Sequence, residues 1–522
     1  MKKNLFFASI FLLCNLSFVQ AQNKLSIDKV YSAYLRNSGS IMEKNQIKGY
    51  FFLYQSDKID KRTNEYTLQV LDQNLNKVRE IKFEDSKQLN LLEASYNGNS
   101  LAFLFKNADN KTLDMKIYSL DGKLQYTYSS AFDKRTEDLM NTYATLHTDE
   151  GTNQNVFDVD GHGYVSVLPL RDGKQRTYSI VYYSSEEKKQ WTYQPQDDEE
   201  RFTTAEYLGG TDSLILLLVT KKDRMLSGKL KASLVGVNFK TRKKAFELED
   251  TDDKYVHVPT TIVPGKEKGQ IIVIGSYFIK GDDIAKDFSK GLAVLTINSD
   301  GKILNKVYNS WVFDFGKYLS TNNKGKIDKI GYLYIHKVIQ TPDGKSFVVS
   351  EGYKRQASAG GIAATVLLGA MGARSSAIGV TKIVVTDLVL MELDKDYKVS
   401  NAGIYDKETH TVDASSESDF TSQHQIAMAV KMVGGFDYEF TTGEVDNSNF
   451  TVCYSNYESS ADYKGQTFNA IRFNGAKFTT DKIPLKSKAS KLKVFPAKPG
   501  SVMIMEYFKK EKRLDFRLEK LG

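Results

Sequence analysis

Hydrophobic and polar positions alternate along most of the chain in short stretches, and one unit of stretch, turn and stretch returns many times. The turns are rich in Asp, Asn, Gly and Lys, which supply the side-chain acceptors and positive φ angles that hairpins need. Period-two alternation between such turns is typical of β-strands. The pattern predicts a repetitive all-β protein, most simply a β-propeller-like ring. Five clear turns lie at 71–74, 120–123, 298–302, 393–396 and 473–475.

Each repeat contains one strongly apolar strand, which we expect to be buried on both faces between neighbouring blades. Eight segments have this character: 49–54, 101–105, 164–168, 214–219, 271–274, 347–350, 450–454 and 502–505. A further strand follows each of them after a polar loop: 66–71, 115–120, 179–183, 232–238, 292–298, 388–393, 468–473 and 513–518. The count predicts eight blades, with seven as the alternative, and β-sandwich domains in series as a third interpretation.

The last repeat holds three strands, at 491–495, 502–508 and 513–518, whereas a blade needs four. The segment 27–35 near the N-terminus has the length and alternation of the missing outer strand. Pairing it with the C-terminal blade would close the ring and remove an exposed edge. We therefore expect residues 22–522 to form a single propeller-like domain.

The first 21 residues have the pattern of an export signal: Lys2 and Lys3, an apolar run from Leu5 to Val19, and a small residue, Ala21, at the cleavage site. Residues 1–21 are thus predicted to be a signal peptide, and the protein is expected in the periplasm or outside the cell. Cleavage removes one of the 2 cysteines and leaves Cys453 without a disulfide partner. Within an apolar strand, Cys453 is predicted to be a small buried hydrophobic residue.

Charge is mixed and spread along the chain, with 72 Lys and Arg against 64 Asp and Glu and a formal net charge of +8. Nucleic-acid binding usually shows clustered charge and a recognisable module, and neither is visible. The composition therefore argues against a nucleic-acid partner. The 30 Tyr and 29 Phe fit a strand-rich chain whose rings pack on pleated faces.

One stretch departs from the repeat: residues 357–377 consist almost wholly of Ala, Gly, Ser and aliphatic side chains. Its apolar part, 362–373, is shorter than the roughly 20 residues of a membrane span, so no transmembrane segment is expected in the mature chain. The first interpretation is a short helical insertion that folds against the ring. The second is an element that docks a partner or touches a membrane surface, with Ile362, Leu367, Leu368 and Met371 as contact residues.

Candidate chemistry is sparse. Asp158 and Asp160, before Gly161, resemble the start of a calcium loop, but Pro169 stands where its last ligand belongs, and a structural turn explains the same residues. His336 alternates into a strand and is interpreted as a hydrogen-bonded strand residue rather than a catalytic base. No catalytic residue, metal site or cofactor motif is identified, although a divalent ion such as calcium stays an alternative.

A polar cluster follows the apolar strand at 347–350. In propellers, ligands usually meet loops at one end of the central channel, and this cluster is expected at such an end. It is interpreted as a set of surface contacts for a ligand, made by Glu351, Tyr353, Lys354 and Arg355.

Several segments resemble an uncharacterised family of exported envelope proteins from Gram-negative bacteria. The resemblance rests on residues 37–39, 47–52, 58–64, 70–75, 331–336, 343–345, 351–354 and 381–385, together with the Ala/Gly stretch. It covers most of the mature chain and implies that the Ala/Gly insertion is part of the family's architecture. The family is one of unknown function, so it implies no activity and no catalytic residue.

Two functions from different classes follow from these observations. The first is an exported β-propeller-like binding or scaffolding protein, whose partner is an envelope protein or polymer met by loops of one ring face. The second is an envelope or extracellular hydrolase or lyase that acts on glycans or peptides in the channel. Only fold analogy supports the second. A cluster of His and carboxylate side chains at the channel mouth would favour it.

Overall fold

The structure is a computed structural model, and parts of the chain at both ends and in several connections lie outside the residues that it describes. The described residues are 24–34, 39–43, 45–132, 134, 156–159, 161–172, 175–195, 202–222, 229–249, 252–285, 287–322, 325–357, 381–412, 423–460 and 462–521. The predicted signal peptide, the apolar stretch 362–373 and Asp160 lie outside them.

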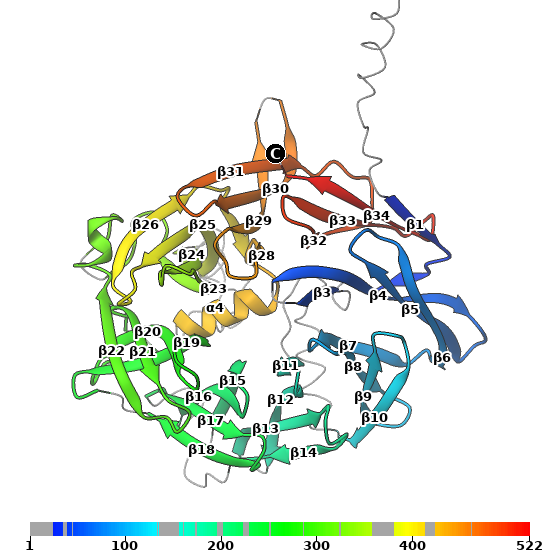
Figure 1. Ribbon diagram of the computed structural model, residues 1–522, viewed down its shortest axis with the longest axis horizontal. Coiled ribbons are helices and arrows are strands. Elements are labelled where there is room, and N and C mark those ends of the chain that lie inside the picture. The colour runs from blue at the N-terminus through cyan, green and yellow to red at the C-terminus, as the bar shows by residue number, and fades with distance from the viewer. Residues whose placement is uncertain are drawn as a thin grey trace, which may run out of the picture.

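The described strands form antiparallel sheets arranged around a ring (Figure 1). Seven hydrogen-bonded sheets are present, and the one that runs from β11 to β18 comprises two blades joined by a single parallel pair, Arg176 with Phe202. The described part of the chain thus contains eight blades, and the predicted all-β, propeller-like fold is confirmed.

Blade 1 contains β2 (Ser32–Ala33), β3 (Gly39–Glu43), β4 (Gln46–Lys58), β5 (Thr63–Asp72) and β6 (Lys77–Ser86), and blade 2 contains β7 (Leu89–Tyr96), β8 (Ser100–Asn107), β9 (Thr112–Ser119) and β10 (Leu124–Ala131). Blade 3 contains β11 (Phe157–Val159), β12 (Gly163–Asp172), β13 (Gln175–Ser184) and β14 (Gln190–Tyr193). Blade 4 contains β15 (Phe202–Gly210), β16 (Leu214–Lys222), β17 (Lys231–Asn238) and β18 (Lys243–Leu248).

Blades 5 to 8 follow in the same order, together with the helices of the described residues. Blade 5 contains β19 (Tyr255–Pro264), β20 (Ile271–Ile279), β21 (Gly291–Ile297) and β22 (Ile303–Ser310), and the 3-10 helix η2 (Phe315–Lys317) follows it. Blade 6 contains β23 (Tyr332–Gln340), β24 (Ser346–Ala357), β25 (Thr381–Leu393), β26 (Val399–Tyr405) and β27 (His410–Val412), and α4 (Gln423–Met432) follows it. Blade 7 contains β28 (Tyr438–Gly443), β29 (Phe450–Ser459), β30 (Lys464–Phe473) and β31 (Phe478–Pro484). Blade 8 contains β32 (Lys491–Pro496), β33 (Ser501–Phe508), β34 (Arg513–Lys520) and β1 (Lys24–Asp28).

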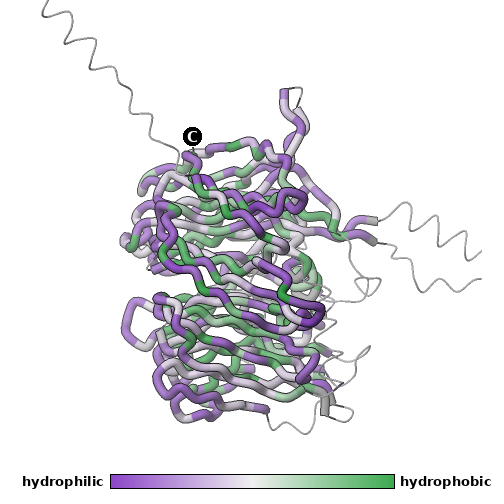
Figure 2. The backbone as a smooth tube through the Cα atoms, turned by 90° about the vertical axis from the view of Figure 1, so that its right-hand side faces the viewer, coloured by the Kyte–Doolittle hydropathy of each residue, from purple (hydrophilic) through white to green (hydrophobic). Residues whose placement is uncertain are grey.

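The eight strongly apolar segments are the second strands of the eight blades, and each lies between two neighbouring blades as predicted. Adjacent residues of one such strand enter different cores: Phe51 packs towards blade 2, whereas Phe52 packs towards blade 8. Eight apolar clusters of buried residues each join two successive blades around the ring. In the side view, hydrophobic segments run along the strands and hydrophilic segments mark many of the turns (Figure 2).

The N-terminal strand closes the ring, but not with the predicted bounds. Lys24–Asp28 pairs with β34 as the outer strand of blade 8, whereas Ser32–Ala33 pairs with β4 of blade 1. Between them, Lys29 has a φ of 60°, which interrupts an extended strand. The predicted outer strand at 27–35 is therefore divided between two blades. Cys453 is buried between blades 7 and 8, and burial raises the pKa of its thiol, as expected of a small core residue.

Three of the five predicted turns share one local structure. At the start of the turn, a side-chain oxygen accepts backbone N–H groups two and four residues later: Asp72 from Asn74 and Asn76, Asn298 from Asp300 and Lys302, and Asp394 from Asp396 and Lys398. The side chain thus replaces backbone partners that the turn leaves unsatisfied. These residues are committed to hairpin geometry.

The two faces of the ring differ. The hairpin face, as we name it, holds the turns between the first and second and between the third and outer strands, the longest of which are 265–270 and 444–449. The loop face is the opposite face, and the described residues of its connections include 311–322, 325–331, 406–412 and 423–437. Helix α4 belongs to the last of these and lies towards the ring centre (Figure 1). No helix among the described residues is long and apolar enough to span a membrane.

Candidate functional site

Helix α4 is the main regular element on the loop face, and apolar contacts fix it against blade 6. Ile426, Ala427 and Val430 recur at helical spacing, and they are buried in a cluster with Tyr334 and Tyr353. The helix ends at Met432, and Gly434, two residues later, has a φ of 64°, which suits the left-handed position after a helix. The amide of Gly435 then donates to the Val430 carbonyl at 2.8 Å. The chain is thereby directed into β28.

A buried carboxylate, Glu351 of β24, anchors the segment that follows α4. Its side chain is 0% exposed. Its oxygens accept the backbone N–H of Asp437 at 3.1 Å and that of Tyr438 at 3.1 Å. His336 Nε2 lies 3.2 Å from the other side of the same carboxylate. Blade 6 thus holds the first residues of blade 7 through a single side chain.

Lys407 neutralises this carboxylate and connects it to a second one. Its side chain is 0% exposed, and its Nζ lies 3.1 Å from Glu351 Oε1 and donates to Asp437 Oδ2. On the far side of Asp437, His410 Nδ1 lies 3.4 Å from Oδ2, and His410 Nε2 lies 2.9 Å from the Gly435 carbonyl oxygen. We call Glu351, Lys407, Asp437, His410 and His336 the ion cluster.

The pKa shifts follow from burial and from these contacts. Burial alone would lower the pKa of Lys407, but Glu351 and Asp437 raise it, so the ammonium form is held. Burial would likewise raise the pKa of Asp437, yet its hydrogen bond to His410 and the charge of Lys407 lower it. The hydrogen bond to Asp437 raises the pKa of His410. Burial lowers the pKa of His336, which is only partly offset by Glu351. The cluster therefore favours the charged forms of Lys407, Asp437 and His410 and the neutral form of His336.

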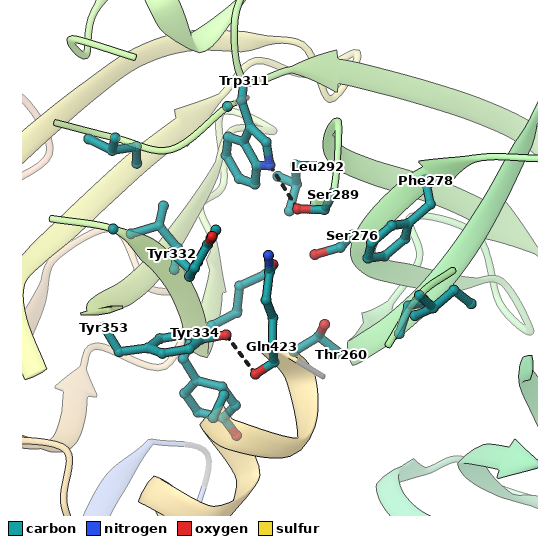
Figure 3. Close-up of a pocket in the computed structure, with 18 residues that line it drawn as sticks. Thr260, Ser276, Phe278, Ser289, Leu292, Trp311, Tyr332, Tyr334, Tyr353 and Gln423 are labelled. Carbon is teal, nitrogen blue, oxygen red and sulfur yellow. Dashed lines mark hydrogen bonds between the residues drawn. The ribbon is translucent and has the colours of Figure 1, made fainter. Parts of the chain in front are cut away.

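Beside the first turns of α4, between blades 5 and 6, lies a cavity of about 60 Å³ (Figure 3). In it, the Trp311 indole N–H donates to Ser289 Oγ at 3.1 Å, and the Tyr353 hydroxyl donates to the Gln423 carbonyl at 2.8 Å. Ligand sites usually measure about 300–1,000 Å³, so this cavity has room for water rather than for a metabolite. The hydrogen bond from Tyr353 to Gln423 holds the first residue of α4 instead.

The predicted surface cluster after β24 is only partly at the surface. Glu351 is 0% exposed and Tyr353 is 4% exposed, so the expectation that they are surface contacts is wrong for both. The reason is that β24 extends to Ala357 and keeps both residues paired with β23 and β25. Lys354 donates to the Lys329 carbonyl, and Arg355 is exposed. A ligand contact by Lys354 and Arg355 stays a prediction.

The remaining candidates are the apolar contact residues and the two aspartates of the calcium-like turn. Ile362, Leu367, Leu368 and Met371 lie outside the described residues, so their contact role stays a prediction. Asp158 is exposed on β11, and its proposed partner Asp160 lies outside the described residues. Within the described ranges, no three His, Cys, Asp or Glu side chains converge as metal ligands would.

Sequence reasoning missed Lys407, Asp437, His410 and helix α4. The helix had a readable signal, because Ile426, Val430 and Val433 recur at helical spacing before Gly434. Lys407 carries no such signal, since the adjacent residues are ordinary polar loop residues. Only the tertiary fold brings it to Glu351.

Replacing His410 by Gln should remove a contribution to stability that exists only at lower pH. Because its pKa is raised above the roughly 6.5 of an unfolded chain, the imidazolium stabilises the fold fully below that pH. The contribution is lost as pH rises through the folded pKa. His410 is 40% exposed, so we expect at most about 1 kcal/mol. Urea unfolding of both proteins between about pH 5 and pH 9 measures it. A difference that does not change with pH would contradict a charged His410.

The comparisons with known proteins concern the family and the fold. A search of curated proteins finds no match. Among solved structures, the chain is similar to the WD40 domain of SCAP from fission yeast, with 8% identity, a TM-score of 0.38, and coverage of 95% of this chain and 94% of that one. It is also similar to prolyl oligopeptidase B from Galerina marginata, with 9% identity, a TM-score of 0.36, and coverage of 91% and 55%.

An ACO/RPE65 chimera matches with 8% identity and a TM-score of 0.29, and the alignment covers 52% of this chain and 60% of the chimera. None of these likenesses bears on function. The sequence comparison is more specific, because the model of one family, described as a family of unknown function, matches residues 1–522. The chain therefore belongs to the Family of unknown function (DUF6770).

Proposed function

We propose that the protein is an exported binding or scaffolding protein that meets an envelope protein or polymer on its loop face. The observation that carries this proposal is the immobilisation of α4 and of residues 433–438 on that face by the ion cluster and by apolar contacts. Connections on a rigid scaffold are the usual place for binding residues. A helix that is already ordered loses little conformational freedom when a partner binds, which favours affinity.

The ion cluster resembles the constellation that would favour an enzyme, but its groups are committed to each other. Lys407 and Glu351 are buried and paired, and His336 is only 8% exposed. His410 is the most exposed member, and both of its ring nitrogens face acceptors, Asp437 and the Gly435 carbonyl. A general base needs a nitrogen that faces substrate. The cluster therefore supports a structural role better than a hydrolase or lyase.

Export is the second part of the proposal, and it is supported by Lys2, Lys3 and the apolar run that follows. N-terminal sequencing of the protein from cell fractions tests it. We expect the mature chain to begin at Gln22.

The partner contact is tested by cross-linking and pull-down from intact envelope. Ala429 is exposed on α4, and Ala429→Arg should reduce partner capture at least about tenfold by adding a bulky charge to the contact. Replacing residues 362–373 by a Gly/Ser linker should have the same effect if that stretch takes part. Lys123→Glu, on the hairpin face, is the matched control and should change nothing. Loss of capture with the control alone would show that the partner meets the other face.

A further inference from the structure

A second cavity, of about 470 Å³, lies on the hairpin face, far in the fold from α4. It is formed by turns of three successive blades, 7, 8 and 1, which are β28–β29, β30–β31, β32–β33, β3–β4 and β5–β6. Strand β32 of blade 8 contacts both β28 of blade 7 and β3 of blade 1 (Figure 1). The volume is that of ordinary small-molecule sites. Unlike the cavity beside α4, it is large enough to hold a small-molecule ligand.

The walls of this cavity are held in place by contacts between blades. Asn45 Nδ2 donates to Asn447 Oδ1 at 2.9 Å, which joins the blade 1 turn to the blade 7 turn. Asn447 Nδ2 donates in turn to the Gln340 carbonyl of blade 6 at 3.1 Å. Buried Ile47, Phe450 and Ala497 form the apolar part of the lining. The site is therefore preformed once the ring is closed.

Positive charge dominates the lining. It includes Lys48, Arg472 and Lys498 against one carboxylate, Glu444. Both Glu444 oxygens are used within its own turn, by Ser448 Oγ at 2.8 Å and by Asn449 Nδ2 at 3.0 Å. The carboxylate therefore stabilises its own turn, and the three cations outnumber it in the lining.

The cations differ in how far they are neutralised. Arg472 is paired with Asp481 at 2.8 Å. Lys48 has a carboxylate, Glu43, only at 3.9 Å, beyond hydrogen-bond distance. Lys498 donates to the neutral amide oxygen of Asn74 at 2.5 Å. The two lysines can therefore donate to an incoming oxygen at little cost.

Asn474 adds a neutral hydrogen-bond donor to the two lysines. Asn474 accepts the N–H groups of Ala476 and Lys477 at its Oδ1, and this orientation leaves its Nδ2 as the group that can donate to the cavity. Together with the lysines, this amide gives the cavity hydrogen-bond donors and a net positive charge, which favours a negatively charged ligand that carries oxygen acceptors.

We infer that this cavity binds an acidic sugar, a monosaccharide- to disaccharide-sized molecule that bears a carboxylate or a phosphate. The lysines bind the acidic group, and the amide and threonine side chains of the lining bind hydroxyls. Ile47, Phe450 and Ala497 contact the carbon skeleton. This site lies on the opposite face from the proposed partner surface and is independent of it.

Isothermal titration of the full-length mature protein with glucuronate, glucose 6-phosphate, glucose and inorganic phosphate tests the inference. We expect at least one of the two acidic sugars to bind, and at least about tenfold more tightly than glucose and inorganic phosphate. Which of them binds identifies the acidic group. No binding by either acidic sugar, or equal binding of glucose or of inorganic phosphate, would overturn the inference.

Two variants locate the site. Lys48→Gln with Lys498→Gln should weaken binding of the acidic sugar at least about tenfold, because both changes keep length and polarity but remove charge. Lys123→Gln, another exposed lysine in a turn on the same face, is the matched control and should bind normally. Unchanged affinity in the double variant would refute this location. Partner capture on the loop face should be normal in the double variant, so failure of either proposal leaves the other one standing.

Discussion

A mature chain that begins at Ser32 instead of Lys24 should lose at least about 3 kcal/mol of unfolding free energy. It lacks β1, whose five residues pair with β34. It also lacks Ile27 and Val30, which are 5% and 0% exposed, and burial of each such side chain contributes about 1.5–3 kcal/mol. The Tyr507 hydroxyl would lose its acceptors, the carbonyls of Val30 and Tyr31. Loss of these groups opens the ring at one edge.

Urea unfolding followed by circular dichroism measures this effect, and a chain that begins at Lys24 is the control. Ile27→Ala in the otherwise complete chain should cost about 2–5 kcal/mol, which separates the apolar contribution from that of the strand pairing. If the chain from Ser32 unfolds at the same urea concentration as the control, β1 does not close the ring. The acidic-sugar site gives a second readout, because its walls come from the blades that meet at this closure.

Lys407→Met should destabilise the protein by about 3–5 kcal/mol. The variant leaves Glu351, which is 0% exposed, and Asp437 without their shared cation, and removal of one partner from a buried ion pair exposes the full cost of desolvating the other. The double variant with Glu351→Gln should recover part of the loss, because the most deeply buried uncompensated charge is then absent. Chemical denaturation of the single and double variants measures both values.

Lys345→Met provides the matched control for this effect. Lys345 pairs with Glu392 at 2.8 Å, but its side chain is 43% exposed, so its loss should cost no more than about 1 kcal/mol. Equal stability of the Lys345 and Lys407 variants would mean that the ion cluster does not anchor α4 and β28. Partner capture should fall with Lys407→Met and not with Lys345→Met.

Local pattern predicted the strands well because each blade repeats the same requirement. A second strand packs on both faces, so segments such as 214–219 must be apolar throughout, and this is visible without the fold. The turns are equally local, since Asp72 bonds to backbone within its own hairpin. The bounds of the strand that closes the ring could not be predicted from local sequence pattern. They depend on β34, almost a whole chain length away, and on the turn at Lys29.

The candidate site, in contrast to the strands and turns, could not be predicted from local sequence pattern. Glu351 follows an apolar strand and looks like a surface residue in the sequence, yet it is buried because Lys407, His336 and two backbone amides surround it. No spacing rule connects Lys407 or Asp437 to Glu351, because the long connection between β26 and β28 brings them together. Burial of Glu351 depends on partners that lie far from it in the sequence, on other strands and connections of blade 6 and at the start of blade 7.

The sequence by itself determined the all-β architecture and the repeated blade, because alternation and hairpin chemistry act between near neighbours. It favoured eight blades over seven, and the tertiary structure decided between these numbers for the described residues. The tertiary structure alone decided which strand closes the ring, which charges are buried, and which face carries α4. It also formed the cavity at blades 7, 8 and 1, whose lysines come from opposite ends of the chain. The physical reason is that strand pairing and ion pairing between distant segments depend on ring closure, to which every blade contributes.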